Sequence, residues 1–178
     1  NRKKREGCLE RAWEVGGGKG ESAVRMSEIA RLTGISRQAV YLHYPSRAEL
    51  LIATTRYIDE VKEIDKRLAA SRNAASGTDR LDAFVRAWGN YIPEIYGVAR
   101  ALIALQASDE AARAAWTDRM DAVRHGCEAA VAALKKEELL ASALSANEAT
   151  DLLWRLLSVE SWENLRRRCG WSQARYLK

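Results

Sequence analysis

The sequence predicts an all-α protein with a small N-terminal domain and a larger C-terminal one. Proline occurs only at positions 45 and 93, so few points along the 178 residues would interrupt a helix. Alanine, leucine, arginine and glutamate are abundant, and the alternation of polar and apolar residues that is typical of strands is absent. We therefore expect residues 1–52 to form a three-helix domain and residues 53–178 to form a second helical domain.

Turn and capping residues predict four helices at the N-terminal end. Their expected ranges are 2–15, 27–33, 36–45 and 46 to about 70. Three consecutive glycines, Gly16 to Gly18, should end the first helix because glycine destabilises helix interiors. Gly34 should supply the positive φ that ends the second, and Ser36 and Ser46 should cap the third and fourth.

The C-terminal part predicts four longer helices. Their expected ranges are about 78–91, 93–106, 109–138 and 145–169. Pro93 should start the second of these helices, and Ser145 with Glu148 forms a capping-box pattern at the start of the last. Gly170 should end the last helix and leave a tail or a final turn.

The positive charge of the chain lies in its first third. Residues 1–56 contain 11 Lys and Arg and 6 Asp and Glu, whereas the remainder contains 18 of each kind. This asymmetry favours an anionic partner for the N-terminal part, most commonly a nucleic acid and less commonly a membrane surface. A solvated basic face without a partner is the alternative.

Residues 26–45 predict a helix-turn-helix, because two short helices are joined by a tight turn at Gly34. At about 100° per residue, Arg37, Gln38 and Tyr41 fall on one side of the second helix, opposite Ala39. Arginine can pair with guanine and glutamine with adenine in a major groove, and hydroxyl groups suit phosphate oxygens. The alternative is an ordinary three-helix packing unit with exposed polar residues.

The stretch "MSEIARLTGISRQAVYLHYPSRAELL" resembles the DNA-binding domain of the TetR family of bacterial transcriptional regulators. Tyr41-Leu42-His43-Tyr44 resembles the aromatic-x-His-aromatic end of that family's recognition helix. Pro45-Ser46-Arg47 resembles the start of its fourth helix. The resemblance implies groove-facing residues at Ser36, Arg37, Gln38 and Tyr41, phosphate contacts from Tyr41, His43 and Arg47, and a backbone or hydroxyl contact at Met26 and Ser27.

Two of these positions depart from the family pattern. Met26 stands where many members have threonine, so one phosphate contact is in doubt. Gln38 stands where many members have a small residue, so it would either read a base or hold the helix slightly away from the DNA.

The resemblance also implies a C-terminal domain that binds a small effector. Trp88, Tyr91 and Tyr96 flank Pro93, where an interrupted helix would favour an apolar cavity. Trp116 and Trp154 are further aromatic candidates for its lining. Aromatic residues are more often part of a core than of a pocket, so core packing remains the alternative.

The same domain is expected to form a homodimer. The helix at 109–138 carries small residues that permit close helix approach, and the helix at 145–169 carries an apolar stripe wider than one core face needs. Candidate interface residues are Ala122, Ala129, Ala133, Leu153, Leu156 and Leu157. Two such helix pairs would form a four-helix bundle across a two-fold axis, unless both faces are intramolecular core.

Other function classes find little support in the sequence. No nucleophile elbow, phosphate loop or dinucleotide-binding glycine pattern is present, and His43 and His125 lack metal-ligand spacing, so we expect no catalytic residue, metal or cofactor. No run of apolar residues is long enough to span a membrane. Three widely spaced cysteines fit the reducing cytoplasm.

The sequence therefore predicts a cytoplasmic, nucleoid-associated regulator. As a homodimer it would bind a palindromic DNA operator, act most simply as a repressor, and be released by an unidentified small-molecule effector. The alternative is a helix-turn-helix protein that acts through protein partners, or binds the nucleoid without sequence preference, and has no effector.

Overall fold

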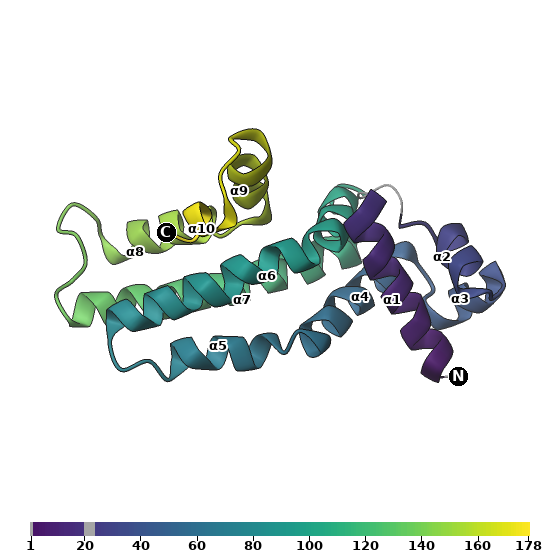
Figure 1. Ribbon diagram of the computed structural model, residues 1–178, viewed down its shortest axis with the longest axis horizontal. Helices are drawn as coiled ribbons and strands as arrows, with labels where there is room; N and C mark the ends of the chain where they lie inside the picture. Colours follow the sequence, from purple (N-terminus) through teal and green to yellow (C-terminus); the bar gives the residue numbers. More distant parts are fainter. Residues whose placement is uncertain (1, 20–23) are drawn as a thin grey trace. The chain divides into compact units, whose positions relative to one another are not determined.

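The computed structural model describes residues 2–19 and 24–178, and the regular elements of these residues are all helices (Figure 1). In chain order they are α1 (Arg2–Lys19), α2 (Met26–Thr33), α3 (Arg37–His43), α4 (Arg47–Val61), α5 (Ile64–Arg72), α6 (Gly77–Leu105), α7 (Glu110–Lys136), α8 (Ala146–Leu156), α9 (Val159–Glu163), the π-helix η2 (Asn164–Arg168) and α10 (Gln173–Tyr176). The all-α prediction is confirmed.

The chain divides into two compact units. Unit 1 comprises residues 1–62 and 94–117, and unit 2 comprises residues 63–93 and 118–178. The predicted domain boundary after residue 52 stays a prediction.

Unit 1 is built on the packing of α1 against α2 and α4, and of α2 against α3. Its core contains fully buried aliphatic side chains, among them Ile29, Val40, Leu50 and Leu51. Because Val40 faces this core, the opposite side of α3 is left to solvent.

The predicted end of the first helix is wrong, because α1 continues through Gly16, Gly17 and Gly18 to Lys19. Packing explains why the helix tolerates glycine at position 16. A Cβ atom at Gly97 of α6 would lie 1.8 Å from the Gly16 carbonyl oxygen, so the two backbones approach each other with no side chain between them. Close packing here outweighs the low helix propensity of glycine.

The single helix predicted from residue 46 to about 70 is also wrong, because it is divided into α4 and α5. Lys62 ends α4, and Glu63 takes a left-handed conformation with φ of 49°. No glycine or proline marks this break, so the sequence pattern gave no signal for it.

A third correction concerns Pro93, which lies inside one continuous helix, α6, instead of starting a new one. Proline has no backbone N–H and therefore leaves the carbonyl of Gly89, four residues earlier, without its helical donor. The side chain of Gln173 replaces that donor, since its Nε2 lies 3.0 Å from the Gly89 carbonyl oxygen.

The long C-terminal helices follow their predicted starts more closely than their predicted ends. Asp109 takes the capping role at the start of α7, because its side chain accepts a hydrogen bond from the Ala112 N–H at 2.9 Å. The capping box of Ser145 and Glu148 is confirmed at the start of α8. The helix predicted to reach residue 169 is divided into α8, α9 and η2, and Ser158 caps α9.

The residues after Gly170 form a docked segment instead of a free tail. Gly170 has the expected positive φ of 69°, and α10 follows it. Tyr176 donates a hydrogen bond from its hydroxyl to the Leu156 carbonyl at 2.9 Å, and Trp162 donates one from its indole N–H to Gln173 Oε1 at 3.0 Å. We call residues 171–178 the C-terminal segment.

Candidate nucleic-acid interface

The turn between α2 and α3 has the geometry that the sequence predicted. Gly34 ends α2 with φ of 67° and ψ of 22°, in the left-handed region that glycine adopts without steric conflict. Ser36 begins α3, and its hydroxyl oxygen accepts a hydrogen bond from the Ala39 N–H at 3.1 Å. These two residues fix the direction in which α3 leaves the turn.

The outer face of α3 presents polar side chains that contact each other. Arg37, Gln38 and Tyr41 are exposed, whereas Val40 on the opposite face is fully buried. The Arg37 guanidinium lies over the Tyr41 ring, 5.5 Å from its centroid, and Arg37 Nη2 lies 3.4 Å from the Tyr41 hydroxyl. Both side chains are thus held on the one surface that this helix offers to a partner.

The end of α3 is fixed by a buried tyrosine. Tyr44 is 3% exposed and donates a hydrogen bond from its hydroxyl to the backbone carbonyl of Arg5 in α1, at 3.1 Å. Burial raises the pKa of the Tyr44 hydroxyl, so this donor stays protonated. His43 remains half-buried, with its ring edge-on to that of Tyr44 at a centroid distance of 6.5 Å.

Three further predicted contact residues lie at the starts of α2 and α4. The Met26 side chain is buried, which leaves only its backbone available to a partner, whereas Ser27 is exposed. Arg47 is half-buried, and its Nε donates a hydrogen bond to the Val24 carbonyl at 2.7 Å. That bond holds the segment before α2 against α4.

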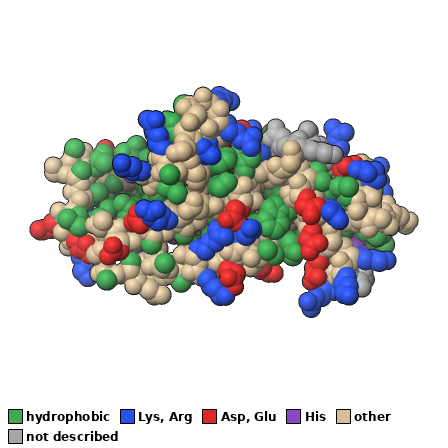
Figure 2. All heavy atoms as spheres, viewed as in Figure 1, with side chains coloured by type: hydrophobic (Ala, Val, Ile, Leu, Met, Phe, Trp, Pro, Cys, Tyr) green, Lys and Arg blue, Asp and Glu red, His purple; other side chains and the backbone are tan. Residues whose placement is uncertain are grey.

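A group of cations at the start of α1 was not predicted as a contact site. Lys and Arg side chains gather at the N-terminal end of this helix in Figure 2, and Arg2, Lys3, Lys4 and Arg5 are all exposed. The run of consecutive basic residues was the available signal, because clustered cations favour phosphate.

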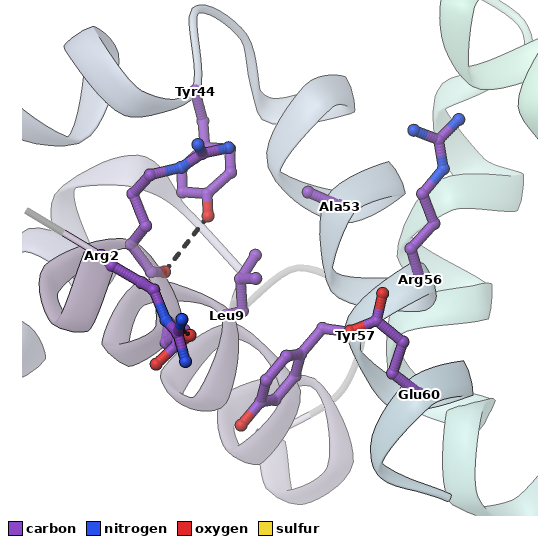
Figure 3. Close-up of a pocket in the computed structure, with 9 residues that line it drawn as sticks. Arg2, Leu9, Tyr44, Ala53, Arg56, Tyr57 and Glu60 are labelled. Carbon is purple, nitrogen blue, oxygen red and sulfur yellow. Dashed lines mark hydrogen bonds and ion pairs between the residues drawn. The ribbon is translucent and has the colours of Figure 1, made fainter. Parts of the chain in front are cut away.

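A polar cavity of about 660 Å³ also lies in unit 1, between α1 and α4 (Figure 3). Its lining includes Arg5 and Leu9 of α1, Tyr44, and Arg56 and Tyr57 of α4. None of the predicted ligand-binding residues lines it.

The predicted effector-binding aromatics are distributed over both units. Trp88 and Tyr91 are buried together in unit 2, with ring centroids 5.6 Å apart, and Trp88 donates its indole N–H to the Leu157 carbonyl at 2.9 Å. Trp154 is also in unit 2, whereas Tyr96 and Trp116 are in unit 1. The cavities of about 660 Å³ in unit 1 and about 540 Å³ in unit 2 are lined by other residues.

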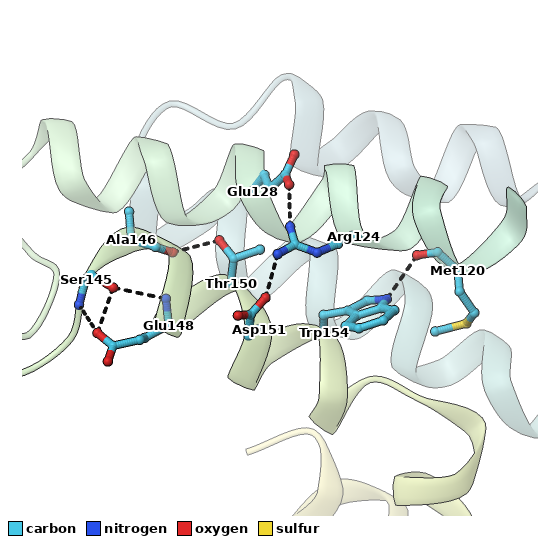
Figure 4. A network of polar contacts seen from close by, with 9 residues as sticks. All are labelled: Met120, Arg124, Glu128, Ser145, Ala146, Glu148, Thr150, Asp151 and Trp154. Carbon is cyan, nitrogen blue, oxygen red and sulfur yellow. Dashed lines mark hydrogen bonds and ion pairs between the residues drawn. The ribbon is translucent and has the colours of Figure 1, made fainter. Parts of the chain in front are cut away.

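Trp154 belongs to a network that joins α7 and α8 (Figure 4). Its indole N–H donates to the Met120 carbonyl at 3.0 Å, and the Arg124 guanidinium lies 5.9 Å from its ring centroid. Arg124 also pairs with Glu128 and, at 2.5 Å, with Asp151 of α8. This network covers one side of the α7–α8 pair.

The predicted dimer residues differ in exposure. Leu156 is 54% exposed and Leu157 is only 3% exposed, so the two adjacent leucines face opposite directions. Leu153, Ala129 and Ala133 are half-buried, and Ala122 is exposed. Leu152, which belongs to the same apolar stripe, adds a further exposed apolar side chain to α8.

The described residues hold no group of three or more His, Cys, Asp or Glu side chains placed to bind a metal ion. Cys8 and Cys127 are buried, and burial raises the pKa of the Cys127 thiol to about 12, which keeps it protonated and poorly nucleophilic. None of the described helices combines the length and the apolar character that crossing a bilayer needs.

Comparison with known proteins supports the DNA-binding interpretation of this surface. The sequence pattern of bacterial regulatory proteins of the tetR family matches residues 9–54, which contain the whole helix-turn-helix. Residues 9–54 therefore carry the DNA-binding pattern of the TetR family. Both the matching family and the curated relative described below are named as regulators.

Individual similar proteins extend the comparison. The HTH-type transcriptional regulator BetI of Rhizobium meliloti (strain 1021) is 37% identical over 83 residues, which are 47% of this chain. The alignment spans only 40% of that relative.

Solved structures share the whole fold at lower identity. A Saccharomonospora viridis protein described as a transcriptional regulator, in complex with choline, has a TM-score of 0.82 and 20% identity, covering 99% of this chain and 93% of its own. The transcriptional regulator FadR of Bacillus subtilis, in complex with stearoyl-CoA, has a TM-score of 0.67 and 13% identity, covering 97% and 91%.

Proposed function

We propose that this chain is a TetR-family regulator that controls transcription by inserting α3 into the major groove of an operator. The observation that carries the proposal is the arrangement of α3, in which Val40 is buried and Arg37, Gln38 and Tyr41 form an exposed polar face. A helix with one side buried and the other lined by a guanidinium and an amide suits base edges.

The contact residues have distinct roles in this proposal. Arg37 and Gln38 read bases, while hydroxyl, imidazole and guanidinium groups bind phosphates and set the register. The phosphate contacts come from Ser27, Ser36, Tyr41, His43 and Arg47, with a backbone contact at Met26. Arg37 leaves the face of Tyr41 to reach a base, and each side chain then contacts the DNA separately.

Two copies of the chain bind the operator as a homodimer. A helix-turn-helix dimer places two recognition helices about one turn of DNA apart and therefore favours a palindromic site. The exposed Leu152 and Leu156 of α8, together with the small residues of α7, support a dimer surface on these helices. The regulator acts as a repressor when its operator overlaps a promoter. It works in the cytoplasm, where the chromosome lies.

A small-molecule effector releases the DNA. The ligands in the complexes of these two solved structures, choline and stearoyl-CoA, differ greatly in size and charge. They support an organic effector in the C-terminal region of this chain, but two such different ligands do not define its chemical class.

The alternative function also uses the DNA-binding domain but involves no specific operator sequence. Such a protein would act through protein partners, or bind the nucleoid without sequence preference or effector. Sequence selectivity separates the two functions, because a specific regulator prefers its operator over random DNA by a factor on the order of 10³ or more.

The deciding experiment is selection of bound sequences from a random duplex pool at about physiological salt. Enrichment of a palindrome is the expected result. Binding that remains sensitive to salt but enriches no sequence would favour the alternative function.

Two substitutions then test the assigned roles. Arg37→Ala should relax base preference at one position of each half-site, whereas Arg47→Ala should weaken binding to all sequences and lower the salt dependence. Since Arg47 also bonds to the Val24 carbonyl, thermal unfolding of each variant serves as the control. Equal and sequence-independent losses from both would contradict base reading by Arg37.

A further inference from the structure

Unit 2 contains a groove that none of the predicted ligand-binding residues lines. The groove has a volume of about 540 Å³, within the range of small-molecule sites. It lies between the start of α6, the end of α8 and the C-terminal segment. Its lining residues are Thr78, Leu81, Asp82, Val85, Leu153, Leu156, Leu157, Leu165, Trp171, Arg175, Tyr176, Leu177 and Lys178.

The wall formed by the C-terminal segment is fixed in place by specific contacts. The Tyr176 hydroxyl donates to the Leu156 carbonyl at 2.9 Å, and Gln173 Nε2 donates to the Gly89 carbonyl at 3.0 Å. Gly89 has no side chain where Leu177 packs, since a Cβ atom there would lie 2.5 Å from Leu177 Cδ2. The groove is therefore formed before any ligand arrives.

The interior of the groove is apolar. Leu81 and Val85 come from α6, Leu153 from α8 and Leu165 from the π-helix η2. Single π-helical turns occur often at functional sites, because they redirect side chains that a regular helix would place elsewhere. An alkyl chain is the ligand group that these walls would accept.

The charged groups of the groove favour an anion. Arg175 and Lys178 contribute two positive charges, and the one acidic side chain among the lining residues, Asp82, is paired with Arg86 at 2.7 Å. The Arg175 guanidinium also covers the Trp171 ring, 4.4 Å from its centroid. A ligand cation would therefore meet repulsion from Arg175 and find the aromatic face of Trp171 already occupied.

We propose that this groove binds an amphipathic anion, with an alkyl chain between α6 and α8 and a carboxylate at Arg175. Binding itself is independent of the proposed function. Only the consequence, release of DNA by this ligand, rests on it.

The test measures binding to the full chain without DNA, by calorimetry, using dodecanoate below its micelle-forming concentration. Dodecyltrimethylammonium, with an equally long chain and the opposite charge, is the matched ligand. We expect dodecanoate to bind at least about tenfold more tightly, and affinity to rise roughly tenfold for each two CH₂ groups added from hexanoate to dodecanoate. Equal binding of both amphiphiles, or no saturable binding of dodecanoate, would overturn the proposal.

Variants locate the site. Arg175→Gln should weaken dodecanoate binding about tenfold, because a charged hydrogen bond is lost. Arg155→Gln should leave it unchanged, since Arg155 is on α8 but does not line the groove. Leu81→Gln, at a half-buried groove residue on α6 outside the proposed dimer surface, should also weaken binding. Equal effects of Arg175→Gln and Arg155→Gln would place the ligand elsewhere and contradict the proposal.

Two further measurements distinguish ligand binding from coverage of the groove by a second copy and from the effector step of the proposed function. Leu156 belongs both to the groove lining and to the proposed dimer surface. If the dimer covers the groove, it binds no dodecanoate, and that result would overturn the ligand site. Saturable dodecanoate binding that is lost in Arg175→Gln supports the ligand site even if dodecanoate fails to release selected operator DNA. That failure would count against the effector step of the proposed function alone.

Discussion

The helix-turn-helix and the C-terminal segment are stabilised by different kinds of contact. In the first, Gly34 and the capping serines act on residues three or four positions away in the chain. In the second, Gln173 bonds to Gly89 across 84 residues of sequence. The bond from Trp88 to Leu157 elsewhere in unit 2 is of the same kind and spans 69 residues. A local contact can be predicted from a few adjacent residues in the sequence, whereas a distant contact can be identified only in the folded structure.

This difference predicts that the largest loss of stability comes from a distant contact. Trp88→Ala should lower the free energy of unfolding by about 4 kcal/mol, because it removes a large buried side chain and leaves a cavity. Trp88→Phe retains most of the volume and should lose about 1–3 kcal/mol for the unsatisfied Leu157 carbonyl. Urea unfolding of both variants measures the two effects. A Trp88→Phe variant as stable as the original would show that the hydrogen bond contributes little.

The turn of the helix-turn-helix should be the most sensitive local feature. Gly34→Ala introduces no collision, since no atom lies within 4 Å of the added Cβ, so its effect reports the left-handed backbone alone. We expect a loss of about 1–2 kcal/mol by urea unfolding, and a smaller loss for Gly34→Asn. Equal tolerance of alanine and asparagine would indicate that the turn can form without a positive φ.

A double-mutant cycle measures the contact between Pro93 and the C-terminal segment. Gln173→Ala should cost about 1 kcal/mol, because the Gly89 carbonyl loses its donor. In a Pro93→Ala background the restored backbone N–H bonds to that carbonyl, so the same substitution should cost less. The bond from Trp162 to Gln173 is lost in both backgrounds and cancels. Equal costs in the two backgrounds would contradict a replacement of the missing N–H by Gln173.

The smallest expected effect is a pH dependence at the start of α8. The hydrogen bonds from Ser145 hold the pKa of Glu148 below its ordinary value of 4.5. A lowered pKa means that the ionised carboxylate stabilises the folded state above pH 4.5 and that this contribution is lost as the pH falls through the lower, folded-state pKa. Glu148→Gln should therefore be less stable than the original near neutrality, and thermal unfolding should show the difference shrinking below pH 4.5. A difference independent of pH would contradict an ionic contribution.

The success of the sequence predictions also depended on whether an element is fixed by local or by distant contacts. Gly34, Ser36, Ser46 and Ser145 act locally, and the helix ends that they define were found from the sequence. The continuation of α1 through its glycines could not be, because it depends on the approach of Gly97 from far along the chain. Pro93 was misinterpreted for the same reason, since its compensating donor lies 80 positions later in the numbering, at Gln173.

The candidate site shows the same contrast. The exposed face of α3 follows from helical periodicity, so Arg37, Gln38 and Tyr41 could be grouped in advance. The contact between Arg37 and Tyr41 and the inward direction of Met26 required the folded unit. The groove of unit 2 had no sequence signal, because its walls come from three separate parts of the chain.

The approach of Gly16 to Gly97 has a mechanical consequence for unit 1. Helices that pack through side chains can slide, because rotamers adjust, but here the backbone of α1 meets the backbone of α6 directly. Beside this point Trp13 donates its indole N–H to the Glu94 carbonyl at 2.9 Å, and Lys62 pairs with the Glu94 carboxylate at 3.2 Å. The 94–105 part of α6 and the end of α1 are thus joined by backbone packing and a hydrogen bond. We expect the two to move together as one rigid piece.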